Sequence, residues 1–228
     1  MSEEKKISVA IDGPSGAGKS TIAKMVSNRF GFVYVDTGAV YRTVGLFVKR
    51  AGVSPRSEQD VSGLLPSIHM DICYDDSGLQ RMILGGEDVT ESIREPEISR
   101  YASDVSALPS VRAFLLDMQR DVARKRSVVM DGRDIGTVVL PQADVKIFLT
   151  ASAEERAKRR YLELCSKGVK TNYHDVYAQM KERDKNDSSR AISPLRPAKD
   201  SITIDTTQLG LEQSYEKVAG LIKKAACK

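Results

Sequence analysis

The residues with the clearest chemistry lie near the start of the chain. Residues 13–20 read Gly-Pro-Ser-Gly-Ala-Gly-Lys-Ser, which fits the phosphate-binding pattern G-x-x-x-x-G-K-[S/T]. In such a loop, backbone N–H groups close around a β-phosphate and the following helix start adds partial positive charge. We expect Lys19 to reach the β- and γ-phosphates of a nucleotide and the Ser20 hydroxyl to ligate Mg²⁺. The residues expected to contact the nucleotide are Gly13, Pro14, Ser15, Gly16, Ala17, Gly18, Lys19, Ser20 and Thr21.

The sequence on both sides of this loop predicts the elements that such a site needs. The apolar run 7–11 predicts a buried strand before the loop, and Ile22, Val26 and Phe30 share one face of a helix after it. The alternative is a chance glycine-rich turn before a helix. It is disfavoured because strand, loop and helix all agree with the motif.

A second group of polar residues follows the apolar run 32–35. Asp36 and Thr37 stand at the end of this predicted strand, and Arg42 lies about one turn into the next helix. Arg42 could therefore hold a second anion at the ligand edge of a parallel sheet. An ordinary helix cap with a solvated arginine explains the same residues, and these residues alone leave both interpretations open.

A third group follows the apolar run 128–130. Asp131 could act on the Mg²⁺ shell, as acidic residues at such strand ends do in P-loop enzymes. Arg133 could clamp a phosphate, and Asp134 could accept a hydrogen bond from the amino group of a base. A salt-bridged tight turn is the alternative. We favour a functional site because these residues stand at the carboxyl end of a strand.

Three arginines share one face of the helix predicted after Ser152. Arg156, Arg159 and Arg160 are spaced i, i+3 and i+4, so they repel one another unless an anion or acidic residues lie among them. One interpretation is a mobile lid that lowers arginines onto transferring phosphates. A solvated helix with salt bridges to Glu155 and Glu163 is the alternative.

These groups are positioned by a chain in which short apolar runs alternate with amphipathic stretches, a pattern typical of a parallel α/β sheet. Residues 68–89 break the alternation and predict an inserted antiparallel hairpin. We predict one domain over 1–228. Its core spans about 1–36, 110–151 and 191–228, the region with the insertion spans about 37–109, and the possible lid spans about 152–190. The five predicted core strands are 7–11, 32–35, 128–130, 145–149 and 202–204.

Composition excludes several other classes. The formal net charge of +4 does not require a nucleic-acid partner, and no apolar stretch approaches the roughly 20 residues of a membrane span. The start of the chain is charged, so we expect no secretory signal. Cys73, Cys165 and Cys227 lack zinc spacing and are typical of reduced thiols in the cytoplasm, where we expect this protein.

Taken together, these motifs resemble the bacterial cytidylate kinases, the (d)CMP kinases of the nucleoside monophosphate kinase group. The loop alone would not choose among many nucleotide-binding families, whereas the run 131–139 joined to 36–42 is specific. The matching stretches are residues 11–20, 36–42, 86–89, 111–112, 131–139 and 181–191, in that order over nearly the whole chain.

The resemblance implies a five-stranded parallel core, a helical lid, and transfer of the γ-phosphoryl group of ATP to CMP or dCMP with Mg²⁺, within pyrimidine nucleotide metabolism. It also implies a monomer. Thr37 stands where serine is common, and 185–186 and 188–189 replace a more arginine-rich run. The implied catalytic residues are Lys19, Arg133, Arg190, Arg156 and Arg159. The implied substrate-binding residues are Arg42, Arg133 and Arg190 for the CMP phosphate, Arg183 and Asp187 for the ribose, Ser103, Arg112 and Asp134 for cytosine, with Asp36, Thr37 and Tyr41 beside them.

The motifs contain no general base for an alcohol acceptor. A phosphate monoester is already largely ionised at neutral pH, because its second pKa is about 6, so a phosphate acceptor needs no such base. The remaining alternatives are a kinase for another small acceptor, such as UMP or shikimate, and a P-loop protein that binds nucleotide or nucleic acid without catalysis. The dispersed basic residues and the lack of an aromatic stacking platform argue against nucleic acid.

Overall fold

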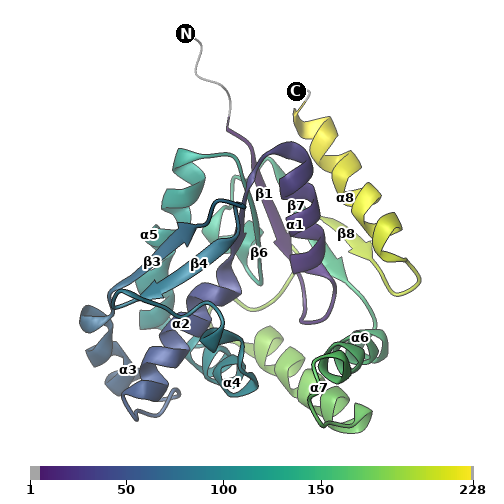
Figure 1. Cartoon of the computed structure of the whole chain (residues 1–228). Helices are drawn as coiled ribbons and strands as arrows, with labels where there is room; N and C mark the ends of the chain where they lie inside the picture. The colour runs from purple at the N-terminus through teal and green to yellow at the C-terminus, as the bar shows by residue number, and fades with distance from the viewer. Residues whose placement is uncertain (1–5, 227–228) are drawn as a thin grey trace. The chain divides into compact units, whose positions relative to one another are not determined.

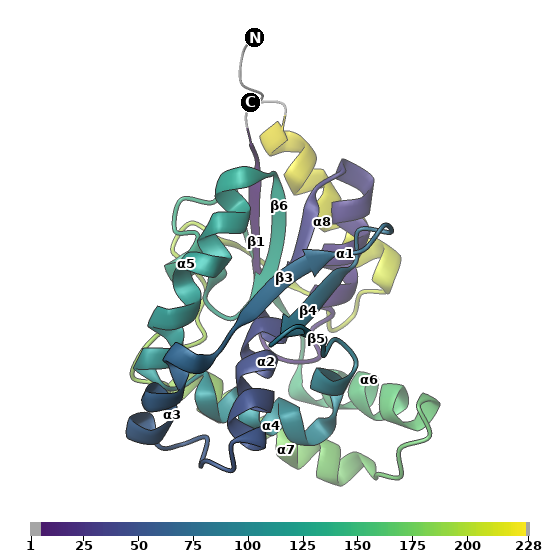
Figure 2. The same cartoon turned by 60° about the vertical axis from the view of Figure 1, so that its left-hand side comes forward.

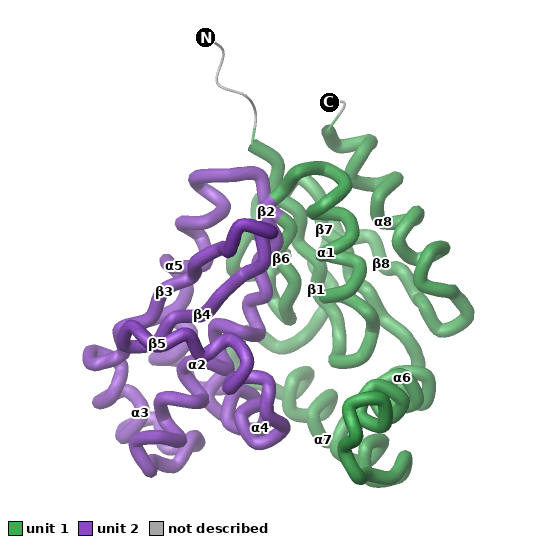
Figure 3. Tube along the Cα trace, viewed as in Figure 1, with its two compact units in different colours: residues 1–32, 129–228 green, residues 33–128 purple. Residues whose placement is uncertain are grey.

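The computed structural model describes residues 6–226 (Figure 1). Contacts between residues divide the chain into two compact units, shown in Figure 3. Unit 1 comprises 1–32 and 129–228, and unit 2 comprises 33–128. The stretch 110–128, which the sequence assigned to the core, is therefore grouped with unit 2.

The predicted five-stranded sheet of a P-loop kinase is confirmed. Its strand order is β2-β6-β1-β7-β8, and the β1–β7 and β7–β8 pairs are parallel. The inner strands are near-continuous apolar runs, as expected where a parallel sheet is covered on both faces. Val128, Val129 and Met130 are fully buried, whereas Ile202 of the edge strand is 47% exposed. The strands are β1 (Ser8–Asp12), β2 (Val33–Asp36), β6 (Val128–Gly132), β7 (Val145–Thr150) and β8 (Ile202–Asp205).

Helices α1 (Lys19–Phe30) and α8 (Leu211–Ala226) lie side by side in unit 1 (Figure 1). Ile22 of α1 is buried as predicted. Of the residues expected on the apolar side of the last helix, Val218 and Ile222 are buried, whereas Leu211, at the start of α8, is 52% exposed. Arg29 of α1 donates to Glu216 of α8 over 2.9 Å. The 3.6-residue periodicity therefore identified most of the face that each helix buries, and it failed in the first turn of α8.

The segment 152–190, which the sequence predicts to be a lid, contains two neighbouring helices, α6 (Ala153–Ser166) and α7 (Tyr173–Ser189) (Figure 1). The Ser152 hydroxyl caps α6 by accepting the Glu155 N–H at 3.2 Å, as the sequence predicted. The Asn172 side chain caps α7 by accepting the Asp175 N–H at 2.9 Å. A π-helix, Ile135–Val139, follows β6 after a short turn.

Unit 2 contains the predicted hairpin and four helices (Figure 2). The hairpin strands form an antiparallel pair, and β5 adds a third short strand that the sequence did not predict. These strands are β3 (Met70–Tyr74), β4 (Gln80–Leu84) and β5 (Glu87–Asp88). The helices are α2 (Thr37–Arg50), α3 (Glu58–Leu64), α4 (Pro96–Val105) and α5 (Pro109–Lys125), with 3₁₀ turns at Leu65–Ser67 and Ser92–Arg94.

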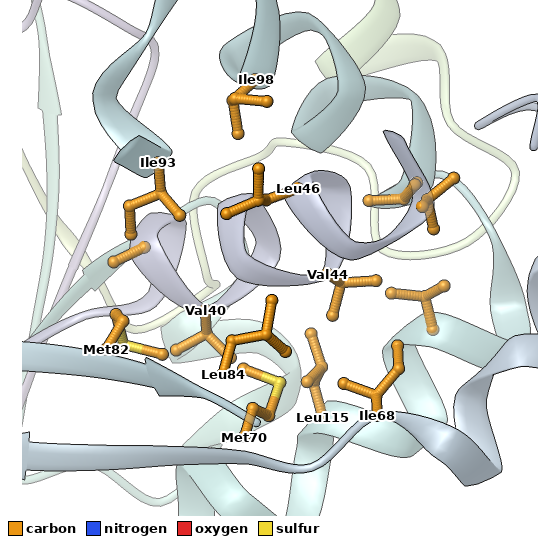
Figure 4. Packing of buried hydrophobic residues seen from close by; sticks show 14 of the residues in the cluster. Val40, Val44, Leu46, Ile68, Met70, Met82, Leu84, Ile93, Ile98 and Leu115 are labelled. Carbon is orange, nitrogen blue, oxygen red and sulfur yellow. The ribbon is translucent and has the colours of Figure 1, made fainter. Parts of the chain in front are cut away.

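Figure 4 shows the apolar core of unit 2, in which one face of the hairpin packs against α2. Met82 and Leu84 of β4 alternate with less buried residues and meet Val40 and Val44 of α2. Gly45 allows α4 to approach α2 closely, because a Cβ at this position would lie 3.0 Å from the Ala102 nitrogen. This packing holds the first turn of α2, which carries the polar residues of the second predicted group.

Two further expectations concern membrane-spanning helices and the cysteines. Across residues 6–226, every helix falls short of the length and apolar character that crossing a bilayer would require. Cys73 and Cys165 are free and exposed, whereas Cys227 lies outside the described residues.

Candidate active site

The backbone of the glycine-rich loop requires glycine at three positions. Gly13, Gly16 and Gly18 have φ values of 147°, 77° and 91°, in the region that other residues rarely adopt. A Cβ at Gly13 would also lie 1.9 Å from the Leu149 carbonyl oxygen. Gly18 caps α1 without a side-chain acceptor, and the first turn of α1 holds no acidic residue. The loop therefore presents the positive end of a helix to an anion.

Lys19 is buried at the start of α1, and its Nζ donates to the Pro14 carbonyl at 2.7 Å. Burial, followed by the positive charge of Arg133, lowers the pKa of Lys19 to about 7. An incoming polyphosphate would raise this pKa again, because an adjacent anion favours the ammonium form. The energetic cost of burying Lys19 is thus offset when a phosphate binds.

The Ser20 hydroxyl donates to the Asp131 carboxylate over 2.7 Å. Asp131 lies in β6 and Ser20 in α1, so the fold brings together two oxygen donors that are 111 positions apart. Mg²⁺ is typically bound by one or two such protein oxygens together with substrate phosphates. The donor set therefore fits Mg²⁺.

Asp187 lies between two of the predicted arginines. Its side chain accepts from Arg133 Nε at 2.8 Å and from Arg190 Nη2, and it is 2% exposed. Burial alone would raise the pKa of Asp187, but the charges of Arg133, then Arg190 and Arg183, outweigh burial and lower it. This carboxylate therefore stays ionised and holds two guanidinium groups that the sequence separates by more than fifty residues.

Asp134, predicted to read the base, is buried immediately before the π-helix, and its carbonyl accepts from Val138 at 2.8 Å. The next two N–H groups, of Ile135 and Gly136, donate to the carboxylate of Asp12 at 2.8 and 2.7 Å. The sequence pattern assigned no role to Asp12. The signal was present, since Asp12 ends a buried strand as Asp36 does, and that position drew attention to Asp36.

Arg156 is buried and fully engaged by neighbouring groups in this structure. It forms two hydrogen bonds with Asp184, of 3.1 and 2.6 Å, and donates to the Ser15 carbonyl of the loop at 3.1 Å. A Cβ at Gly16 would lie 3.0 Å from Arg156 Cβ, so the loop packs directly on α6. Asp184 was missed because nothing in its spacing pairs it with α6.

The other two arginines of α6 also pair with carboxylates. Arg159 donates to Glu155 at 3.0 Å and to the carbonyl of Thr206 at 2.8 Å. Arg160 donates to Glu163 at 2.7 Å. In this structure the salt-bridged alternative thus describes the α6 arginines, which the sequence also assigned to a lid acting on phosphates.

In unit 2, Asp36 forms the helix cap that one of the two interpretations predicted. Its carboxylate caps α2 through the Ala39 N–H at 2.9 Å and pairs with Arg42 at 2.8 Å. Burial would raise the pKa of Asp36, yet the charge of Arg42, the Ala39 N–H and the charge of Arg94 together outweigh burial and lower the pKa. Gly38 leaves room for this pair, since a Cβ there would lie 3.0 Å from the Arg42 guanidinium. Arg42 is therefore held in place rather than solvated.

Gln80 fixes the backbone of the same turn and was also missed. Its Oε1 accepts the Asp36 N–H at 2.7 Å, and its Nε2 donates to the Asp36 carbonyl at 3.2 Å. Gln80 shares the buried face of β4 with Met82 and Leu84. A polar residue on the apolar face of a strand was the available signal.

A second cluster in unit 2 joins the start of α5 to α2 and α4. Arg112 is buried, its Nη1 donates to the Ser106 carbonyl at 2.9 Å, and its guanidinium lies 5.6 Å from the centre of the Tyr41 ring. Ser106 in turn donates to the Ser103 carbonyl at 2.9 Å. The structure thus places Arg112 beside Tyr41 and links it to Ser103 through Ser106. Thr37 is buried at the start of α2.

A buried lysine lies in a glycine loop between a strand of the parallel sheet and a helix, and this arrangement defines a P-loop kinase. The model of the family described as cytidylate kinase matches residues 9–224, and the chain belongs to this family. This membership confirms the predicted cytidylate kinase function at the level of the family, together with the classes transferase, kinase and nucleotide-binding protein.

Individual relatives agree with this assignment. A cytidylate kinase of Caldicellulosiruptor bescii is 51% identical over 220 residues, which cover 96% of this chain and 97% of the relative. A cytidylate kinase of Bacillus licheniformis is 45% identical over 99% of this chain and 100% of the relative. A crystal structure of an uncharacterized protein from Eubacterium ventriosum shares the fold, with a TM-score of 0.54, 14% identity, and coverage of 98% and 100% of the two chains.

Proposed function

We propose that this chain transfers the γ-phosphoryl group of ATP to CMP or dCMP, giving ADP and CDP or dCDP. This makes it a phosphotransferase with a phosphate group as acceptor. The observation that carries the proposal is the loop 13–20, with its buried Lys19, in a chain that the cytidylate kinase model matches over 9–224. We also propose that it works as a cytoplasmic monomer without membrane or nucleic-acid partners.

The reaction must overcome repulsion between two anionic substrates. The attacking group is a phosphate oxygen that is already largely ionised at pH 7, since the second pKa of a phosphate monoester is about 6. Proton removal by the protein is therefore unnecessary. What the protein supplies is positive charge and in-line alignment. A lid of α6 and α7 would keep water from accepting the phosphoryl group.

In unit 1, the loop residues hold the ATP phosphates and Lys19 contacts the β- and γ-phosphates. Ser20 and Asp131, whose oxygens lie 2.7 Å apart, would hold Mg²⁺. The ion supplies neutralisation of phosphate charge when bound. Arg156 and Arg159 contact the transferring phosphates in this proposal, which requires phosphate oxygens to replace their present carboxylate partners.

The acceptor residues are proposed for each unit separately. In unit 1, Arg133 and Arg190 hold the CMP phosphate, Arg183 and Asp187 contact the ribose, and Asp134 contacts cytosine. In unit 2, Arg42 holds phosphate, Ser103 and Arg112 contact cytosine, and Asp36, Thr37 and Tyr41 line the same region. The ion pairs around Asp187 and Asp36 support these roles, because each keeps its arginines in a fixed position. The domain limits proposed are a core of about 1–36, 110–151 and 191–228, a CMP-binding region of 37–109 and a lid of 152–190.

Selection of cytosine follows from hydrogen-bond polarity. The exocyclic N4 amine of cytosine donates a hydrogen bond, which the Asp134 carboxylate can accept. Uracil presents the O4 acceptor at the same place, so two acceptors would face each other. A buried polar group left without a partner discriminates strongly between ligands.

The test is an ADP-release assay with Mg²⁺-ATP and, separately, CMP, dCMP, UMP, AMP, GMP and shikimate. We expect rapid turnover with CMP and dCMP and little with the others. Turnover with a different acceptor would retire the roles of Ser103, Arg112 and Asp134. The proposed reaction would be contradicted if ATP were consumed without any acceptor. It would also be contradicted if none of the six acceptors gave turnover. Size-exclusion chromatography with light scattering tests the monomer.

A further inference from the structure

The segment that carries Arg133 and Asp134 is tied to the phosphate-binding loop through one carboxylate. Asp12 is the last residue of β1 and directly precedes Gly13. Its two oxygens accept the N–H groups of Ile135 at 2.8 Å and Gly136 at 2.7 Å. These are the first two residues of the π-helix that follows Asp134. One side chain thus spans 123 positions of sequence and fixes where this helix begins.

We propose that Asp12 is a positioning residue for base selection, which holds the backbone after Asp134 so that the Asp134 carboxylate meets the cytosine amine. This inference rests on the proposed function, since it assumes that Asp134 reads the base. Asp12 itself touches neither substrate. Its effect is expected on CMP recognition and not on ATP binding.

The local packing supports a functional and not merely a structural purpose. Asp12 is 5% exposed, and its carboxylate is held by two backbone N–H groups. Burial raises the pKa of Asp12 to about 6, even though those N–H groups and Lys19 lower it. Burial thus makes the ionised carboxylate costly, while the two N–H groups need its two acceptor oxygens. A carboxylate gains over an amide because both of its oxygens accept.

The surroundings of Asp12 also predict how its two hydrogen bonds to Ile135 and Gly136, here called the clamp, respond to acid. The charged groups that act on Asp12 are Asp134, which raises its pKa, and Lys19, which lowers it, and Arg133 also interacts with it. Protonation of Asp12 would place an O–H donor against two N–H donors and release one of them. The preference for CMP over UMP should therefore fall as pH drops below about 6. Both acceptors carry the same 5′-phosphate, so phosphate ionisation cancels in this ratio.

Two variants disturb the clamp independently. Asp12→Asn keeps the size of the side chain but leaves one acceptor oxygen, so one of the two N–H groups loses its partner. Gly136→Ala keeps Asp12 but adds a methyl 3.4 Å from its Oδ2 and 3.3 Å from Lys146 Cδ. The matched control is Asp144→Asn, since Asp144 accepts the Ser8 N–H at 2.9 Å at the other end of β1.

The experiment measures KM and kcat for CMP, UMP and ATP from pH 5.5 to 8.5, with thermal unfolding of each variant. For Asp12→Asn and Gly136→Ala we expect KM for CMP to rise about tenfold, as for loss of one hydrogen bond to a charged group, and the CMP/UMP ratio of kcat/KM to fall. KM for ATP should stay within about twofold of the wild type. Asp12→Asn should be at least as heat-stable as the wild type, and its CMP/UMP ratio should not depend on pH.

Three results separate the outcomes. A wild-type protein that does not phosphorylate CMP would contradict the proposed function itself. An active wild type whose variants keep KM for CMP and the CMP/UMP ratio within about twofold overturns the role of Asp12, as does an equal rise of KM for CMP and ATP. If Asp12→Asn does not fold, Gly136→Ala decides by the same criteria.

Discussion

Asp12 and Asp187 are both buried carboxylates of unit 1, yet their surroundings shift their pKa values in opposite directions. Asp12 is held by backbone N–H groups and has a pKa raised to about 6. Asp187 is held by Arg133 and Arg190 and has a lowered pKa. Burial raises the pKa at both positions, so the difference comes from the neighbouring charges. Two carboxylates of similar exposure therefore differ in what their ionised form contributes to stability.

The sharpest test of this comparison neutralises each carboxylate in turn. Asp187→Asn leaves Arg133 and Arg190 buried beside a neutral group, so we expect the free energy of unfolding to fall by about 3–5 kcal/mol. Asp12→Asn should not lower it. Urea denaturation at pH 7.5 measures both. Equal losses for the two variants would show that burial alone, and not the arginines, determines the effect.

The second test removes the positive charge next to Asp12. Lys19→Ala should lower kcat by about 10²–10³-fold, the usual cost of losing one group that stabilises charge in the transition state. The fold should survive, because Lys19 is buried at a cost that its pKa of about 7 reflects. Coupled-assay rates with circular dichroism check this, and Lys24→Ala on the same helix is the control. Near-normal turnover in folded Lys19→Ala would argue against the phosphate loop.

The pH dependence of stability gives a third test, with opposite signs for the two residues. Between pH 3.8, the reference value for Asp12, and about 6, the folded state binds more protons at Asp12 than the unfolded state does, so stability falls as pH rises. The full loss is about 3 kcal/mol above pH 6, at 1.36 kcal/mol per pKa unit. Asp187 contributes stability that is present above its unfolded pKa and is lost only as pH falls below it.

Unfolding of wild type and Asp12→Asn at pH 4 and pH 7.5 isolates the Asp12 part of this dependence. We expect the variant to gain relative to the wild type as pH rises from 4 to 7.5. A stability difference that does not change with pH would contradict the raised pKa.

The smallest expected effect concerns Asp134, which raises the pKa of Asp12 from the adjoining turn. Asp134→Asn replaces the acceptor for the cytosine amine with an amide that can also donate. We expect the CMP/UMP ratio of kcat/KM to fall by about tenfold, within the range of one good hydrogen-bonded pair to a base. Competition between the two acceptors in one reaction measures it. An unchanged ratio would remove Asp134 from base selection.

Much of the fold could be predicted because its signals are local. The five core strands lie within two residues of their predicted limits, since each is a short apolar run with a polar end. Pro96 begins α4 and Ser152 caps α6, as their preferences indicate. The short strand β5 was not predicted, because two exposed residues after a turn carry no strand periodicity.

The candidate site was predictable only in part. Glycine, lysine and serine at motif spacing identify a phosphate loop, because that geometry is built from consecutive residues. Partners on distant elements carry no such spacing. Asp184 joins α7 to Arg156 of α6, and Gln80 joins β4 to the turn at Asp36. Neither contact can be recognised from the sequence, because each depends on how the helices and strands pack.

The sequence by itself determined the phosphate loop, the alternation that builds a parallel sheet, and the residue types that place the chain in its family. Only the tertiary structure decided which charged groups face each other. Ionisation depends on burial and on neighbours within a few ångströms, and those neighbours come from positions 54 residues apart for Asp187 and Arg133 and 123 for Asp12 and Ile135. The sequence identifies each acidic residue, whereas its packing determines its ionisation state.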